Sequence, residues 1–321
     1  MGVVVPPANA ATLLTSWVVD PLGVVLALAL AGAYVVCVVR ARRRGVAWHG
    51  LRTVAFMVLG IGSLVYATCG GLAVYRSSLF VAAAAQATVL SAVTPLGLAL
   101  GDPVALVGKA LGDVDRLRLR RALAGRVARV LMFPLVSSLL AAGSLIAVFF
   151  TGYLASSTSS VLVRDLLYVQ LLVTGLLVVL PLLGEDMLPA WCTHPVRAVV
   201  AFADGLLDAI PGLLVMTAPV LLAPGVRGFA DRTWGPAPAW DQKVGGGTMV
   251  AIAEAVGLPL LAAIIVSWVR ADEADAREID AALDALEVPA VEPGRERPWW
   301  ETDPRYADRR HPGEERPSVP G

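Results

Sequence analysis

The side chains with the greatest capacity for chemistry in this sequence are polar residues inside long apolar blocks. They are Gln86, Gln170, Asp204, Asp208 and Glu254. An ionisable side chain at the centre of a bilayer costs at least about 2.5 kcal/mol, so such a group is usually retained for a function. Counting from the block ends places all but Asp204 at similar depth, and Asp204 lies one helical turn from Asp208. We therefore expect these side chains to share one polar layer in the outer half of a membrane.

Two carboxyl groups in one layer, Asp208 and Glu254, suit a proton or a hard cation. The alternative is that the polar side chains only hydrogen-bond between helices, as membrane glutamines often do, with the carboxyl groups protonated. Both interpretations stay open for the two acids. For Gln86 and Gln170 alone, we favour hydrogen bonding between helices.

Sulfur atoms lie in the same outer half, on Met249, Met216 and Cys69. Cu(I) prefers thioether and thiolate donors, so these residues are candidate metal ligands. Methionine is also a common gap-filler in apolar packing, and we favour that role here. Copper is the one cofactor that the sequence leaves open.

Seven apolar blocks must position these residues, and each is long enough to cross a bilayer, whose core of about 30 Å needs roughly 20 helical residues. Of the 321 residues, 57% are hydrophobic and only 16% are charged, which leaves too little polar surface for a water-soluble fold. Continuous blocks favour helices over barrel strands. We predict an all-α polytopic membrane helix bundle, with spans at roughly 18–39, 51–75, 78–100, 130–152, 163–184, 197–222 and 247–269.

Arginines mark the cytoplasmic side, because short loops rich in Lys and Arg stay there. They cluster from Arg40 to Arg52 and from Lys109 to Arg129. We expect the N-terminus outside and the C-terminus inside, in the cell membrane of a bacterium. This topology places every histidine of the chain on the cytoplasmic side, which excludes an imidazole copper site on the outer face. The histidines are His49, His194 and His311.

The predicted domains are a short extracytoplasmic N-terminus (1–17), a seven-helix membrane domain (18–270) and an acidic cytoplasmic tail (271–321). The tail carries fourteen Asp or Glu and seven Arg, and we expect it to be helical at first and disordered from Pro289. The basic face of the membrane domain follows from its topology. The lipid bilayer is therefore an expected partner and nucleic acid is not.

The last block opens with a distinctive run, Asp241-Gln242-Lys243-Val244-Gly245-Gly246-Gly247-Thr248-Met249. The glycines permit close helix approach. We place Asp241 a few residues before the helix begins, where its carboxylate would accept hydrogen bonds from free backbone N–H groups.

This run, followed by Glu254, resembles the DQxxGGxxM…GE signature of the CtaG family of cytochrome c oxidase assembly proteins, which are multi-spanning and associated with caa-type oxidases. Other segments across residues 15–285 resemble the family in the same order. They are Arg43-Arg44-Gly45 with Trp48, Arg52 and Phe56; Leu79-Phe80 with Gln86; Pro95-Leu96; Leu100-Gly101-Asp102-Pro103; and Trp268 with Arg270 and Asp272-Glu273.

The resemblance implies outer-face histidines that handle copper for the oxidase, and this chain departs from that pattern. Ala83 and Ala87 stand where two histidines would flank Gln86, and Arg164 and Tyr168 occupy the equivalent pair. Alanine cannot ligate a metal, and arginine repels one. We expect a family scaffold that has lost direct copper transfer.

The resemblance thus implies a non-enzymatic membrane assembly factor for respiratory cytochrome c oxidase, in the copper-centre maturation class, with oxidase subunits as partners. The alternative is a transporter or proton-linked permease that uses Asp204, Asp208 and Glu254. An intramembrane enzyme has the least support, because the sequence offers no paired nucleophile and base.

Overall fold

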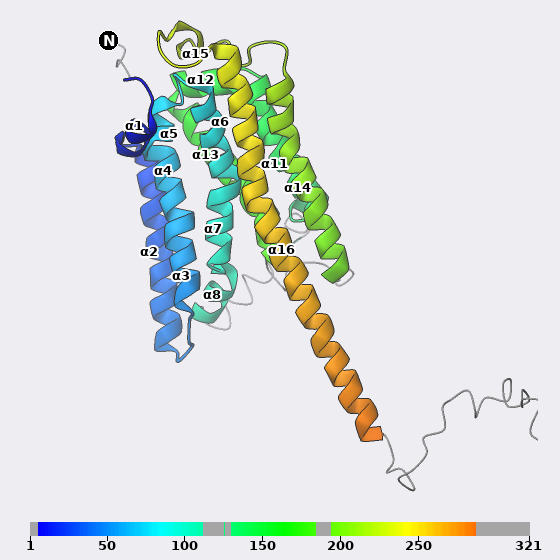
Figure 1. The fold of residues 1–321 in the computed structure, drawn as a ribbon. Helices are drawn as coiled ribbons and strands as arrows, with labels where there is room; N and C mark the ends of the chain where they lie inside the picture. The colour runs from blue at the N-terminus through cyan, green and yellow to red at the C-terminus, as the bar shows by residue number, and fades with distance from the viewer. Residues whose placement is uncertain (1–5, 112–124, 126–129, 184–193, 287–321) are drawn as a thin grey trace, which may run out of the picture. The chain divides into compact units, whose positions relative to one another are not determined.

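The computed structural model describes residues 6–111, 125, 130–183 and 194–286. Every regular element in these residues is a helix, and the long helices of residues 10–268 lie side by side (Figure 1). The elements are α1 (Ala10–Thr15), α2 (Pro21–Arg43), α3 (Gly50–Val54), η1 (Ala55–Gly62), α4 (Ser63–Cys69), α5 (Gly71–Tyr75), α6 (Phe80–Thr88), η2 (Val89–Val93), α7 (Thr94–Leu100), α8 (Pro103–Ala110), α11 (Pro134–Phe150), α12 (Tyr153–Ser159), α13 (Val161–Leu183), α14 (His194–Thr217), α15 (Gly228–Asp231) and α16 (Pro238–Leu286).

Within this described part, six helical segments are long and apolar enough to cross a membrane. The helices α11 and α12 make a seventh if this pair, bent by 69°, is a single span. The predicted all-α polytopic bundle is therefore confirmed, while the orientation of the termini remains a prediction.

The predicted boundaries are wrong at the last two spans. Helix α14 ends at Thr217 instead of 222, and α16 begins at Pro238 instead of 247. The run Gly245-Gly246-Gly247 does not interrupt α16, because neighbouring helices pack where the first two glycines lack side chains. Asp241 and Gln242 consequently lie inside the first turns of a helix.

Acidic caps fix two helix starts. Asp20 precedes Pro21 and accepts a hydrogen bond from the Gly23 amide at 2.9 Å, which starts α2. Asp102 precedes Pro103 and accepts one from the Ala105 amide at 3.3 Å, which starts α8. Proline suits the first helical position, where no N–H partner exists, and the carboxylate satisfies a free amide.

The helix ends form two regions. The arginine-rich end comprises the end of α2, the start of α3, α7 with α8, and the end of α13. The signature end comprises α12, α15, the start of α6 and the start of α16, which lie together at the other end in Figure 1. A buried cluster around Leu64, Leu90, Tyr168 and Met249 joins the helices between them.

The chain separates into two compact units, Met1–Trp268 and Val269–Gly321. In the second unit α16 continues to Leu286, and Arg277 pairs with Glu273 at 3.2 Å one helical turn away. The predicted disorder from Pro289 lies outside the described residues.

Spans two and three meet through paired glycines. A Cβ atom on Gly97 of α7 would lie 2.2 Å from the backbone nitrogen of Gly60 in η1. Gly97 needs the missing side chain because the atoms it would meet all belong to backbone, and a Cβ on Gly60 would meet the Leu98 side chain as well as the backbone of Gly97 and Leu98.

We expect Gly97→Ala to destabilise the protein by about 1–3 kcal/mol, because the new methyl overpacks this contact. Thermal unfolding of the purified protein in detergent would show a lower midpoint. Gly143→Ala is the matched control, because a Cβ there would meet no described atom within 4 Å. Equal midpoints for the two variants would contradict the close contact.

Candidate functional site

Asp241 lies at the centre of the signature end and is 1% exposed. Its carboxylate accepts hydrogen bonds from the backbone amides of Phe80 at 2.7 Å and Val81 at 3.1 Å. These are the first two amides of α6, whose N-cap residue Leu79 supplies no side-chain acceptor. Asp241 therefore caps a neighbouring helix, which corrects the expectation that it caps its own.

Arg232 balances the charge of this carboxylate. Its Nη2 atom lies 3.2 Å from Oδ2 of Asp241, and the side chains are 4% and 1% exposed. The same guanidinium donates to the backbone carbonyls of Trp234 and Pro236. A buried ion pair with these additional hydrogen bonds fixes the chain before α16 against the start of α6.

Gln242 ties the same turn of α16 to the connection after α14. Its side-chain oxygen accepts from the Leu222 amide at 2.7 Å, and its nitrogen donates to the Val220 carbonyl at 3.0 Å. Both groups belong to irregular backbone, and the amide of the buried Leu222 needs an internal partner.

The following signature residues pack on two helices. A Cβ on Gly245 would lie 2.7 Å from the Phe80 ring of α6, and one on Gly246 would lie 2.6 Å from the Met216 nitrogen of α14. Met249 is 2% exposed within the central cluster. The run from Asp241 to Met249 thus acts as one interhelical clamp.

A second buried network centres on the phenol of Tyr168. Its oxygen accepts from Nη1 of Arg76 at 3.1 Å and from Nε2 of Gln86 at 3.1 Å. Gln86 also donates to the Ala67 carbonyl at 2.6 Å, and Arg76 also donates to the Ser157 hydroxyl. Through these side chains the network links α4, α6, α12 and α13.

Sequence reasoning missed the roles of Arg76 and Arg232. Both fall between predicted spans, in the segments 76–77 and 223–246, yet Arg76 is only 6% exposed and Arg232 is paired in the interior. One signal for Arg76 is available in the sequence. It falls in a gap of two residues between the blocks 51–75 and 78–100, too short for a solvated loop.

The polar layer expected in the outer half divides into separate groups. Gln170 donates to the Ser144 hydroxyl at 2.6 Å and accepts from the Tyr153 hydroxyl at 2.9 Å, whereas Gln86 belongs to the Tyr168 network. These side chains therefore do not form one common site, because depth alone does not determine which neighbour a helix face meets. Their shared depth in the membrane stays a prediction.

Asp204 and Asp208 of α14 do lie together. They line a cavity of about 40 Å³ between α14, α11, α13, α16 and the third span. Asp204 is buried and accepts a hydrogen bond from the Ser138 hydroxyl. Ser91 and Thr88 add hydroxyl groups to the same lining, and the cavity is large enough for a water molecule.

Glu254 does not join this pair. It is exposed on α16, whereas Ala253 and Gly257 on that helix line the cavity. Successive helical residues are rotated by about 100°, so Glu254 faces away although its neighbour faces inward. The predicted meeting of Asp208 and Glu254 is corrected accordingly.

The sequence motifs of the first half converge at the arginine-rich end. The Trp48 indole donates to the Tyr34 hydroxyl at 3.1 Å, which donates to the Gly101 carbonyl at 2.9 Å. Phe56 stacks on the Tyr34 ring with centroids 3.9 Å apart. Residues from the segments 43–56 and 100–103 therefore form one assembly with α2.

A family model described as "Cytochrome c oxidase caa3 assembly factor (Caa3_CtaG)" matches residues 32–271 of the chain. The chain belongs to this family. The resemblance carried by the motifs is thereby confirmed.

Relatives of this CtaG-family protein occur in mycobacteria. Uncharacterized proteins of Mycobacterium bovis and Mycobacterium tuberculosis are each 28% identical to it over 290 residues, and one of Mycobacterium leprae is 26% identical over 286 residues. These alignments cover 87% of this chain and 43% of each relative, so the chain spans less than half the length of the proteins it matches. No solved structure matches the chain.

The family's histidine positions hold no copper donors in this member. Ala83 and Ala87 are buried in the apolar cluster. Arg164 pairs with the buried carboxylate of Asp20 at 2.9 Å, and the Tyr168 hydroxyl is shared by Arg76 and Gln86. A guanidinium and a phenol with occupied hydrogen bonds do not fit a Cu(I) ion.

The sulfur candidates have separate surroundings. Met249 fills the central cluster, and Met216 lies at the end of α14, with its backbone against Gly246. The Cys69 thiol lies 3.6 Å from the Thr68 hydroxyl and 4.0 Å from the Asp20 carbonyl. Among the described residues, no three His, Cys, Asp or Glu side chains are grouped to hold a metal ion.

We expect Asp241→Asn to destabilise the protein by about 3–5 kcal/mol, because the change leaves Arg232 buried without its counter-charge and weakens the cap of α6. Thermal unfolding in detergent would measure the loss. Lys243→Gln is the matched control, since Lys243 is exposed two residues away. The double variant Asp241→Asn/Arg232→Gln should recover part of the stability. If Asp241→Asn unfolds at the same temperature as the control, the clamp is not essential.

Proposed function

We propose that this protein is a non-enzymatic assembly factor for respiratory cytochrome c oxidase, in the bacterial cell membrane, and that it acts in copper-centre maturation without carrying copper on imidazoles. The observation that carries the proposal is the family match over residues 32–271. The family description supplies the role in oxidase assembly, and that role makes oxidase subunits the partners of this protein in the proposal.

The chemistry of the signature residues supports a scaffold over a catalyst. Asp241 and Gln242 have their polar atoms committed to backbone groups and to Arg232, and Gly245 and Gly246 are committed to helix contacts. These residues determine how α6, α14 and α16 present the signature end. A client subunit would meet a surface of fixed shape.

The lost histidine positions support indirect action on copper. Tyr168 and Arg164 stabilise the bundle through Arg76, Gln86 and Asp20. In this proposal another protein delivers the metal, and this member holds the oxidase subunit during delivery.

A second candidate function rests on the cavity with Asp204 and Asp208. Two carboxyl groups within a membrane bundle suit proton-coupled transport. Burying an ionisable group in a membrane costs free energy, so such groups are usually retained for a function. Glu254, which the sequence suggested as the third acid, is exposed and does not line this cavity.

We expect deletion of the gene to reduce cytochrome c oxidase activity and membrane copper content strongly, and the intact gene to restore both. The measurements are oxidase turnover and metal analysis of isolated membranes. Normal oxidase activity and copper content in the deletion strain would contradict the assembly role.

The double variant Asp204→Asn/Asp208→Asn separates the two functions, because it removes both acids with little change in size. An assembly scaffold with this variant should restore oxidase activity to the wild-type level. Failure to restore activity, at equal protein abundance in the membrane, would favour a proton-linked role. Glu254→Gln is the control outside the cavity.

A further inference from the structure

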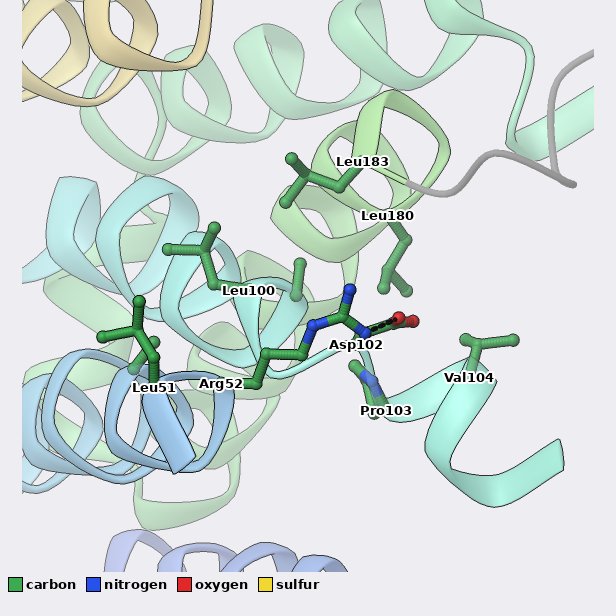
Figure 2. A pocket seen from close by; sticks show the side chains of 10 residues that line it. Leu51, Arg52, Leu100, Asp102, Pro103, Val104, Leu180 and Leu183 are labelled. Atoms are coloured by element: carbon green, nitrogen blue, oxygen red, sulfur yellow. Dashed lines mark hydrogen bonds and ion pairs between the residues drawn. The ribbon is translucent and has the colours of Figure 1, made fainter. Parts of the chain in front are cut away.

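A pocket of about 520 Å³ opens at the arginine-rich end, between the start of span two, the junction of α7 with α8, and the end of α13. Figure 2 shows Leu51, Leu100, Leu180 and Leu183 around it, and of the lining residues that the structure describes only Arg52 and Asp102 are charged. This volume lies within the ordinary range of ligand sites, roughly 300–1,000 Å³.

Arg52 is held at the pocket by two contacts. Its Nη1 atom donates to Asp102 at 2.5 Å, and its guanidinium carbon lies 5.3 Å from the centre of the Trp48 ring. The side chain is 44% exposed. Among the described residues, Nη1 is the only Arg52 nitrogen that makes a hydrogen bond, so Nε and Nη2 are available to an anion's oxygen atoms.

Asp102 does not cancel the positive charge of this region. Its other carboxylate oxygen caps α8 through the Ala105 amide. The segments 40–55 and 95–111 contain six basic residues and no acid other than Asp102. Of these, Lys109 lies 5.2 Å from the Trp48 ring, and Arg44 donates to the Leu111 carbonyl at the end of α8.

We propose that this pocket binds an anionic phospholipid, with the phosphate against Arg52 and an acyl chain along the leucine side chains. The apolar walls come from membrane-crossing helices where they approach the interface, which favours a lipid over a soluble anion. The excess of basic side chains favours an anionic headgroup over a zwitterionic one. This site is independent of the proposed role in oxidase assembly.

The test uses the whole chain of 321 residues, delipidated in detergent, with phosphatidylglycerol, phosphatidylcholine or inorganic phosphate as the probe. Native mass spectrometry would count bound molecules during titration. We expect one tightly bound phosphatidylglycerol and much weaker binding of phosphatidylcholine. Arg52→Gln should weaken phosphatidylglycerol binding about tenfold, as expected for the loss of one charge-assisted contact.

Three further variants separate binding from folding. Leu183→Trp fills the apolar wall without changing charge and should also weaken binding. Asp102→Asn breaks the same ion pair as Arg52→Gln but frees the guanidinium, so binding should persist or strengthen. Arg277→Gln removes an exposed arginine of the second unit and should leave binding unchanged.

Several results would overturn the lipid site. One is equal binding of phosphatidylglycerol by the wild type and Arg52→Gln. Another is equal loss in Asp102→Asn and Arg52→Gln, which would mean that the ion pair acts only on the fold. Equal retention of phosphatidylcholine, or displacement of lipid by inorganic phosphate at similar concentration, would also exclude it.

Discussion

The buried carboxylate of Asp241 holds the signature end together, because it both caps helix α6 and pairs with the Arg232 guanidinium. The first amides of α6 have no partner within their own helix, and the Arg232 guanidinium is buried. In a membrane bundle neither can rely on water, so an internal partner is required. Asp241 serves both, and its position determines where α16 begins to pack.

The rest of the signature follows from that placement. Once the first turn of α16 is fixed, Gly245 faces the Phe80 ring and Gly246 faces the backbone of α14 at Met216. Gln242 then reaches the irregular segment after α14. A side chain longer than hydrogen at either glycine would separate helices that the polar contacts hold together.

The amino-acid pattern was sufficient for the all-α bundle, because hydropathy and block length directly reflect the bilayer. It also identified Asp241, Gln242 and the glycines as a distinctive unit. It could not identify the helix that Asp241 caps, since Phe80 lies 161 residues away. Depth along a helix likewise placed Glu254 at a plausible level but not on the correct face. Only the short gap between the blocks 51–75 and 78–100 set Arg76 apart from an ordinary loop arginine.

The π-helical segments η1 and η2 have a consequence for how the faces of spans two and three are oriented. A π turn accommodates an extra residue, so the helix faces before and after it are rotated relative to a continuous α-helix. Spans two and three each contain such a turn between their ends. The two halves of each span can therefore be oriented separately, so the face that presents Ala83 and Ala87 before η2 is set independently of the face that presents Gly97 after it.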